Sequence, residues 1–573
     1  MAVWDWVFGL PTWVYIIIAF CLLLYLYGIW PYITRRFNFP GPPPRAFMGT
    51  VWEMFSIGVA ESDSRFLKKY GDVIITWGMR TPQLLVGDPD MVKEILVKKF
   101  PNFVNRTITD TLSLTEVESK QLTILQDDDW KFVRATLSPA FSSGRLREVR
   151  LYCIANEVCP GHFVAAVKLK LCPSHFVSNV TLEVVLVSLT YCNVEVCPRQ
   201  FVPTMVPIIQ SVLDNLQDVI AEKSKDGKSI DTQELFKGYT LDAISGTAFG
   251  IDSNSLKNPD DSFAQLLKKL LSPKISMMVL VNMIFPFITK IMKLFKISSF
   301  PKAWQETVDV IARDVKNNID QRKQHGTTRR DLLQLMIDAR VDDLDSADVD
   351  VDRNALKTDV QNQRRGLTET EIKAQCFVFM LGGYATTAGT LSMLSYCLAM
   401  NPECQETLIE EIDTKVGKNK PNYENVMGLP YLDMCISEAL RIYPAGQRLA
   451  RDTKDDIVIG GHLIPKGLSI QIPVNYIHNN PKYWSDPEKF NPQRFSAEEK
   501  AKRHPYAYLP FGHGPRNCVG MRLALLKAKM AVVSILQRYR FVRSAETEAE
   551  LKLQLFGFPE AVNGIWLKLE PRS

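Results

Sequence analysis

The loop FGHGPRNCVG, at residues 511–520, limits the possible folds of this chain more than any other segment. Its glycines and proline favour a tight bulged turn, and the helix-period run MRLALLKAKMAVVSIL follows it directly. Cys518 therefore stands at the opening of a helix, where the helix dipole and free backbone N–H groups stabilise a thiolate. This position predicts that Cys518 is deprotonated and binds a metal.

The neighbours of Cys518 indicate what kind of ligand the loop binds. We expect Phe511 to shield the sulfur from water and Gly520 to let the backbone approach the ligand closely. Arg516 lies nearby in the loop and can pair with a carboxylate on the same ligand. An iron porphyrin with its propionate groups satisfies these requirements. The alternative is a buried free cysteine in a Gly-rich turn, which the agreement of several spaced features disfavours.

An apolar segment without charged residues runs from residue 13 to residue 30, which is about the length that a helix needs to cross a bilayer. We expect residues 1–34 to form a single-pass membrane anchor. The alternative, a cleaved secretory signal, would carry a basic segment in front of the apolar run, and this chain has none there. Arg35 and Arg36 follow the span, so the positive-inside rule places the rest of the chain in the cytosol.

The remaining chain divides into a short linker and one large domain. Residues 35–46 are basic and proline-rich, which predicts a stiff spacer before a catalytic domain at residues 47–573. Most of this domain has helical periodicity, and short β-type runs appear at residues 73–77, 83–86, 457–459 and 469–472. The sequence therefore predicts a mainly α fold with small β-sheets. The formal charge of +5 is small for 573 residues and no basic-aromatic segment occurs, so we expect no binding to nucleic acid.

The cysteine loop resembles the FxxGxRxCxG signature of the cytochrome P450 superfamily, and the resemblance extends over almost the whole chain. Glu438 and Arg441, in SEALRIYP, match the ExxR pair of that family and lie on one helix face. Arg494, in FNPQRF, matches the arginine that completes the same buried network. The resemblance implies the cytochrome P450 fold, with haem b bound through the thiolate of Cys518.

A second set of matches concerns the haem propionates. Trp130 and Arg134 lie one helical turn apart and match the WxxxR motif, whose indole and guanidinium groups meet a propionate. Arg106 in FVNRT and Arg451 in RLAR resemble two further propionate-binding arginines of the microsomal class. The resemblance therefore implies that these residues bind the cofactor together with Arg516.

The segments FNFPGPPP, GDPDMVKEILVKKFPNFVNR and GLPYLDMCISEALRIYP are most similar to the animal three-A subfamily, which oxidises steroids and bulky drugs. This similarity implies large apolar substrates, and the small residues at positions 382 and 446 indicate room for them. By position, the resemblance implies these substrate contacts: Ile108, Val378, Leu381, Gly382, Gly446 and Leu449.

The oxygen-activation segment departs from the family pattern. The superfamily has [AG]GxETT, whereas residues 382–387 read GGYATT, so Ala385 occupies the position of the acid that relays protons. Thr386 can still hold a water over the iron. Two other functions therefore stay open, namely a haem-thiolate isomerase that acts on peroxides and a catalytically impaired haem protein.

The resemblance as a whole implies a haem-thiolate monooxygenase of the endoplasmic reticulum membrane, in which Cys518 and Thr386 are catalytic. The enzyme would insert one oxygen atom from O2 into its substrate, with electrons from NADPH through NADPH–cytochrome reductase and cytochrome b5 as a further partner. Four basic residues expected on the cysteine side could meet an acidic reductase face: Lys131, Arg522, Lys527 and Lys529.

Residues 149–204 have no counterpart in the family, because joining Glu148 to Met205 restores an unbroken helical pattern. This segment holds five of the eleven cysteines, and the phrase Cys-Pro-x-x-Phe-Val begins at Cys159, Cys172 and Cys197. We interpret it as an atypical insertion or a gene-model artefact. The alternative is a metal site, since the first two copies of the phrase have Cys-x-x-His spacing.

Overall fold

A computed structural model describes most of the chain outside the segment at 142–204. The described residues are 12–35, 37–106, 112–141, 205–251, 253–258, 262–271, 277–295, 297–325, 331–339 and 366–572. The predicted insertion at 149–204 and the predicted substrate contact Ile108 lie outside these residues, so the predictions about them stay untested.

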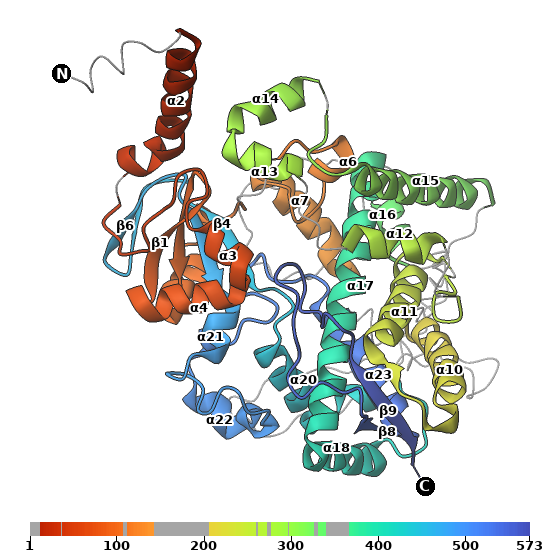
Figure 1. Cartoon of the computed structure of the whole chain (residues 1–573). Helices are drawn as coiled ribbons and strands as arrows, with labels where there is room; N and C mark the ends of the chain where they lie inside the picture. The colour runs from red at the N-terminus through yellow and green to blue at the C-terminus, as the bar shows by residue number, and fades with distance from the viewer. Residues whose placement is uncertain are drawn as a thin grey trace, which may run out of the picture.

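Helices make up most of the described chain, as the periodicity of the sequence predicts (Figure 1). The α-helices are α2 (Thr12–Thr34), α3 (Val51–Ile57), α4 (Val59–Tyr70), α5 (Pro89–Lys93), α6 (Glu116–Ser119), α7 (Asp127–Leu137), α10 (Met205–Lys223), α11 (Thr232–Ile244), α12 (Ser262–Leu271), α13 (Met277–Ile284), α14 (Pro286–Leu294), α15 (Lys302–His325), α16 (Leu332–Asp338), α17 (Glu369–Met400), α18 (Pro402–Lys415), α19 (Tyr423–Met427), α20 (Pro430–Ile442), α21 (Val474–Asn479), α22 (Ala497–Lys502) and α23 (Met521–Leu536). Short π and 3₁₀ turns lie at Glu94–Lys98, Phe100–Asn102, Ser138–Phe141, Lys225–Gly227, Ser245–Phe249, Pro492–Phe495 and Pro505–Ala507.

The strands form small sheets, which confirms the predicted fold class. The strands are β1 (Val73–Gly78), β2 (Thr81–Val86), β3 (Ile230–Asp231), β4 (Arg448–Asp452), β5 (Ile457–Ile459), β6 (His462–Ile464), β7 (Ser469–Pro473), β8 (Tyr539–Arg543) and β9 (Trp566–Pro571). One sheet has the order β1-β2-β7-β4, with β2 parallel to β7 and antiparallel neighbours elsewhere. All four β-type runs of the sequence are strands. Five other strands were not expected, because they are short or carry charged residues that weaken the alternation.

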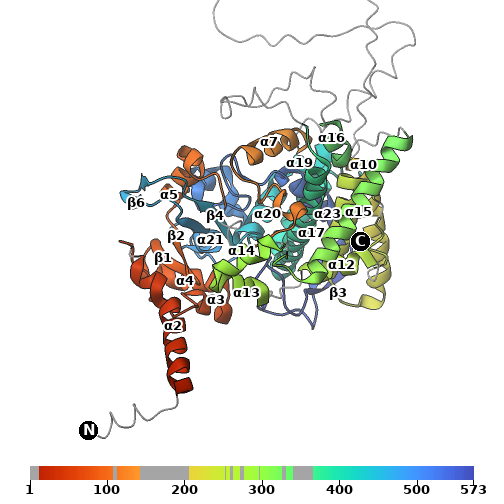
Figure 2. The same cartoon turned by 90° about the horizontal axis from the view of Figure 1, so that it is seen from above.

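Helix α17 is the axis of the main core. A capping box starts it, since the Thr368 side chain accepts from the Glu371 backbone and the Glu371 side chain accepts from the Thr368 backbone. Side chains of α7, α10, α11, α20 and α23 surround it in one large hydrophobic cluster (Figures 1 and 2). A second cluster forms where β1, β2 and β7 pack against α4 and α5. The site described below lies at the end of α23 that faces α17.

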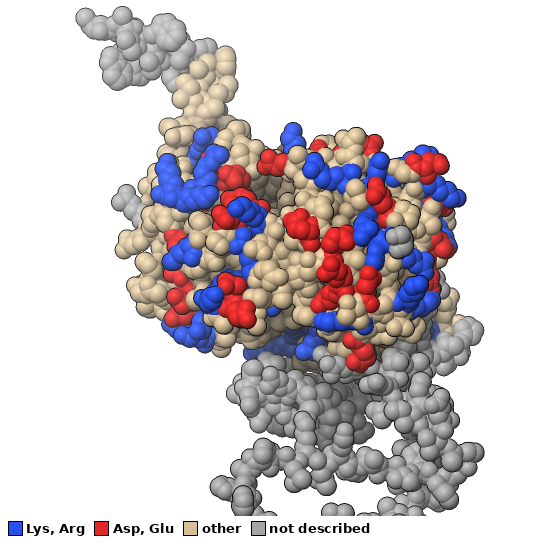
Figure 3. All heavy atoms as spheres, turned by 90° about the horizontal axis from the view of Figure 1, so that it is seen from below, with Lys and Arg blue, Asp and Glu red and all other residues tan. Residues whose placement is uncertain are grey.

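Helix α2 is a candidate membrane anchor at the position where the sequence predicts one. Residues 16–34 are long and apolar enough to cross a membrane, and only 11% of the apolar window is buried in protein. In Figure 3 the helix stands out from the body without a charged side chain, whereas the body carries mixed charges. Helix α17 passes the same length and composition test, but 61% of its window is buried, so it is a core helix.

The anchor and the linker contact the body directly. Tyr27 of α2 stacks on Phe285, which separates α13 from α14, with ring centroids 5.6 Å apart. The guanidinium of Arg80 lies 3.5 Å from the centre of the Tyr27 ring. The proline-rich linker lies along β1, where the Ile75 backbone N–H donates to the Pro40 carbonyl at 2.8 Å. The linker is therefore a packed segment, and α13 and α14, bent by 116° to each other, lie beside the anchor (Figure 1).

Candidate functional site

The cysteine loop forms a closed turn before α23. The Cys518 backbone N–H donates to the Phe511 carbonyl at 2.9 Å, and Gly512 and Gly514 have φ values of +70° and +74°. A Cβ at Gly514 would collide with the backbone carbonyl of Leu96, so only glycine fits there. Helix α23 begins at Met521, so Cys518 stands at the opening of a helix, as the sequence predicts.

The surroundings of Cys518 have opposing effects on the pKa of its thiol. Burial raises its pKa, while the backbone N–H groups of Gly520 and Met521 and the charges of Arg134 and Arg106 oppose that rise. Burial therefore outweighs the dipole effect on which the sequence prediction rests. Yet the side chain is accessible, and a Cβ at Gly520 would meet no atom within 4 Å. A thiolate here requires a further positive charge in the open space, which a bound metal ion provides.

Buried arginines surround this open space. The guanidinium groups of Arg106, Arg451 and Arg516 each keep an Nε that has no hydrogen-bond partner among the described residues. Burial and mutual repulsion lower their pKa values, to about 9 for Arg516. Among the described residues, no ion pair joins these three or Arg134 to a carboxylate. Buried charges of one sign require an anionic partner, so the cluster fits a ligand with carboxylates of its own.

The remaining predicted cofactor residues complete the cluster. Trp130 is buried on α7, and the Arg516 guanidinium lies over its ring at 4.9 Å. Arg516 also donates to the carbonyls of Val104 and, at 2.7 Å, Leu125. Arg134 donates to the Asn517 backbone and side-chain oxygens at 3.0 and 2.8 Å. Asn517, which sequence analysis missed, thus ties α7 to the loop one residue before Cys518.

One face of α17 is accessible although the rest of the helix is buried. Val378, Gly382, Thr386 and Thr390 follow one another at four-residue spacing along this face, and none of them is buried. A Cβ at Gly382 would meet no atom within 4 Å, and the same holds for Gly446. Leu381 is half-buried beside this face. The structure thus leaves room at both positions where the sequence has small residues.

Leu449 and Phe511 belong to the surroundings of the cysteine loop. A Cβ at Gly512 would lie 3.7 Å from the nearest Leu449 methyl group, so strand β4 brings Leu449 to the loop. Phe511 is half-buried and packs against the main core. Ile108 lies outside the described residues. Of the predicted substrate contacts, the structure therefore places Leu449 at the loop and three on or beside the accessible face of α17.

The segment at 382–387 is regular α-helix. The Thr386 hydroxyl donates to the Gly382 carbonyl at 2.5 Å, so its oxygen lone pairs remain available as acceptors. Ala385 is buried, and its methyl side chain has no acidic group. The Thr387 Oγ1 atom is buried without a hydrogen-bond partner. The segment can hold a water at Thr386, but it contains no acidic side chain of its own.

Glu438, Arg441 and Arg494 form the buried network that the sequence predicts. Arg441 donates to both Glu438 oxygens, at 2.7 and 2.9 Å, and Arg494 donates to the same carboxylate at 3.1 Å. Both Glu438 and Arg441 are fully buried. Arg441 also donates to the carbonyls of His478 and Pro487. The network ties α20 to the segment that leads into the cysteine loop.

The predicted reductase-facing residues separate into two groups. Arg522 is exposed and Lys131 is partly exposed, so both are accessible to a partner. Lys527 and Lys529 are 1% and 0% exposed, so the prediction that they meet a reductase is wrong. Lys529 pairs with Asp433 of α20 at 2.7 Å, and Lys527 donates to the Gly383 carbonyl of α17 at 3.1 Å. The two lysines point to nearly opposite sides of α23, and both are buried because every residue of this helix from Leu526 to Leu536 is buried.

The fold and the site together define a haem protein with a cysteine ligand. An accessible cysteine at a helix opening, unpaired buried arginines and an open helix face fit an iron porphyrin with two propionates.

Comparisons with known proteins agree with this class. The family model for cytochrome P450 matches residues 39–158 and 193–564. Cytochrome P450 3A6 of Oryctolagus cuniculus is 34% identical over 577 aligned positions, covering 99% of this chain and 99% of the relative. Cytochrome P450 3A11 of Mus musculus is also 34% identical, covering 99% of this chain and 97% of the relative. Lithocholate 6-beta-hydroxylase of Mesocricetus auratus is 33% identical with the same coverage.

The chain belongs to the cytochrome P450 family. It is a monooxygenase whose cofactor is haem with a cysteine thiolate ligand, and a reductase supplies its electrons. Its apolar helix α2 is a candidate membrane anchor.

Proposed function

We propose that this chain inserts one oxygen atom from O2 into large apolar substrates such as steroids and drugs, with NADPH as the electron source. NADPH–cytochrome reductase would deliver the electrons, and cytochrome b5 would act as a second donor. The observation that carries this proposal is the open space beside Cys518, lined by unpaired buried arginines and adjoined by Leu449. The open positions at Gly382 and Gly446 support a large substrate.

Each site residue then has a defined role. Cys518 would hold the iron, and Arg106, Arg134, Arg451, Arg516 and Trp130 would bind the propionates. When bound, the haem supplies the oxidising chemistry, and the thiolate favours O–O bond cleavage. Thr386 would hold a water through its free lone pairs. Phe511 would shield the sulfur, Gly520 would allow close approach, and the Glu438–Arg441–Arg494 network would keep the loop in place.

The substrate contacts are part of the same proposal. Val378, Leu381 and Gly382 of α17, Gly446, and Leu449 of β4 would line the space in which the substrate lies. These positions are apolar or small, which suits an apolar molecule with few polar groups to orient it. Ile108 would join them from the segment outside the described residues.

We further propose that the enzyme resides in the endoplasmic reticulum membrane with its catalytic domain in the cytosol. Residues 1–34 would be the anchor, 35–46 the linker and 47–573 the catalytic domain. Arg35 and Arg36 follow the span, and the positive-inside rule supports this orientation.

Ala385 supports a second candidate function. A haem-thiolate isomerase that acts on peroxides requires neither reductase nor proton relay, and the missing acid agrees with such a reaction. A catalytically impaired haem protein would also tolerate Ala385.

One experiment separates the three functions. The purified chain should give a thiolate-type carbon monoxide difference spectrum after reduction and should hydroxylate testosterone when NADPH and reductase are both present. Conversion of an organic hydroperoxide to an isomer without NADPH, and no hydroxylation, would identify an isomerase. A thiolate spectrum without either activity would identify an impaired haem protein. A chain without that spectrum would contradict all three.

A deletion tests the proposed insertion at 149–204. The interval between the two ranges of the family match, 159–192, lies within these residues. The cost of closing a loop grows slowly with loop length, so removal of this segment should leave the haem site intact. We expect a variant that lacks residues 149–204 to carry at least as much haem per polypeptide as the full chain. Loss of haem in the variant, with normal haem content in the full chain, would show that the segment is a structural part of the protein.

A further inference from the structure

We propose that Lys527 delivers protons to the oxygen-activating segment of α17, in place of the acid that is absent at position 385. The inference rests on the proposed monooxygenase function, and it assigns a role to a residue that the family motifs do not include.

The position of Lys527 is the first argument. Its ammonium group donates to the Gly383 carbonyl at 3.1 Å, two residues before Ala385, and the side chain is 1% exposed. Within the described chain, no carboxylate forms an ion pair with it. Its neighbour Lys529 is equally buried but pairs with Asp433. An isolated buried ammonium group lowers stability, so its presence at the oxygen-activating segment calls for a functional reason.

The buried surroundings of Lys527 allow its amine to exchange protons near neutral pH. Burial alone lowers its pKa to about 7. Two phenols lie on the facing helices: the Tyr239 hydroxyl of α11 donates to the Lys527 backbone carbonyl at 2.9 Å, and Tyr384 follows Gly383 on α17. Three carboxylates on elements around α23 form ion pairs with other residues: Asp214 of α10 with Lys420, Glu406 of α18 with Arg540 of β8, and Asp433 of α20 with Lys529.

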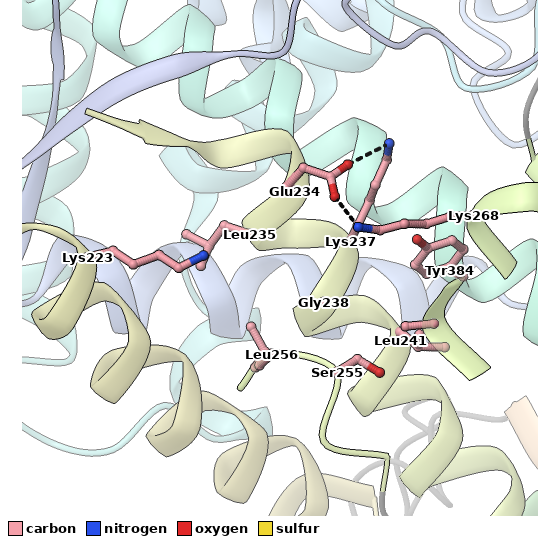
Figure 4. Close-up of a pocket in the computed structure, with 11 residues that line it drawn as sticks. Lys223, Glu234, Leu235, Lys237, Gly238, Leu241, Ser255, Leu256, Lys268 and Tyr384 are labelled. Atoms are coloured by element: carbon pink, nitrogen blue, oxygen red, sulfur yellow. Dashed lines mark hydrogen bonds and ion pairs between the residues drawn. The ribbon is translucent and has the colours of Figure 1, made fainter. Parts of the chain in front are cut away.

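A proton acceptor and a route to solvent lie close by. Thr387 follows Gly383 by one helical turn, and its hydroxyl oxygen is buried without a partner among the described residues. On the other side, a pocket of about 40 Å³ reaches from Lys223 and Glu234 to Tyr384, the residue after Gly383 (Figure 4). The charged side chains of Glu234 and Lys237 line this pocket among apolar residues, and its volume is sufficient for a water molecule.

The proposed step is a simple proton transfer. An Nζ–H bond of the Lys527 ammonium breaks, and the proton passes to a water or to the Thr387 hydroxyl on the way to Thr386. The neutral amine that remains takes a proton from solvent through water in the pocket at Tyr384. No oxidant or reductant takes part in this step.

The first test compares two buried lysines of one helix. With NADPH, reductase and testosterone, product formed per NADPH consumed by the native enzyme should fall as pH rises through about 7, because the ammonium form is lost. Lys527→Met should lower this ratio at least about tenfold at pH 6.5, raise hydrogen peroxide release and abolish the pH dependence. Lys529→Met, the matched control, should keep the native ratio and its pH dependence. A Lys527→Met variant that behaves like the control would overturn the inference.

The second test does not depend on turnover. Because the pKa of Lys527 is lower in the folded than in the unfolded chain, the folded state binds fewer protons between pH 7 and about 10.4, and its stability rises with pH there. Lys527→Met should therefore raise the melting temperature most below pH 7, and the gain should shrink as pH approaches 10. A gain that does not vary with pH would also overturn the inference. A native chain without NADPH-dependent oxidation would refute the proposed function, whereas an active native chain with an unaffected variant would refute only the role of Lys527.

Discussion

Cys518→Ala is expected to abolish the thiolate-type carbon monoxide difference spectrum and to stop NADPH-dependent hydroxylation. The reason is geometric, since Cys518 is accessible at a helix opening, while Cys376, Cys397 and Cys435 are buried within the core. Burial raises the pKa of each of those thiols, whereas at Cys518 the charges of Arg134 and Arg106 oppose this effect. The difference spectrum of the reduced protein measures the outcome directly.

Cys404→Ala is the matched control for this prediction. Cys404 is partly exposed on α18 and lies near Tyr431, away from the loop. The control should retain the native spectrum and activity. A Cys518→Ala protein that retains the thiolate spectrum would mean that another residue holds the iron and that the site assignment is mistaken.

Glu438→Ala should have the second largest effect, this time on stability. The substitution leaves the Arg441 and Arg494 guanidinium groups without their shared carboxylate in a fully buried position. Loss of one partner from a buried ion pair costs about 3–5 kcal/mol of unfolding free energy. Since the network supports the segment before the cysteine loop, haem content should fall as well. Urea unfolding and haem absorbance per polypeptide measure the two effects.

An exposed ion pair provides the comparison. Glu499 pairs with Lys502 at 2.7 Å at the same three-residue spacing, but both side chains face solvent. Glu499→Ala should leave stability and haem content unchanged, because exposed pairs contribute little. Equal losses in the two variants would contradict the proposed structural role of the Glu438 network.

Local patterns in the sequence predicted much of the architecture and the centre of the site. These patterns are local in the chain. The apolar run at the N-terminus predicts a helix, the glycines of the cysteine loop predict a tight turn, and the Glu438–Arg441 spacing predicts a pair on one helix face. The strand β4 and the tie between Arg134 and Asn517 depend on contacts between distant segments, for which a single sequence carries no periodic signal.

The error at Lys527 and Lys529 has a specific physical cause. Lysine side chains are exposed in most proteins, so the residue type alone predicts that basic residues near the cysteine loop lie at the surface. Helix α23 is buried on all sides from Leu526 to Leu536, so its enclosure depends on contacts with distant helices that the sequence of α23 alone does not reveal. Likewise, the sequence predicts that the helix dipole lowers the pKa of Cys518, but it does not predict the opposing effect of burial on that pKa.

Through the contact between Tyr27 and Phe285, bilayer thickness can influence the catalytic body. The apolar span of 19 residues is about 28 Å long at 1.5 Å per residue. A thinner bilayer makes such a helix tilt, and a thicker one deforms around it. Because Tyr27 contacts both Phe285 and Arg80, we expect tilt of the anchor to be transmitted to the α13–α14 pair. Lipid composition can thus adjust the angle at which the enzyme meets its membrane without any change in its core.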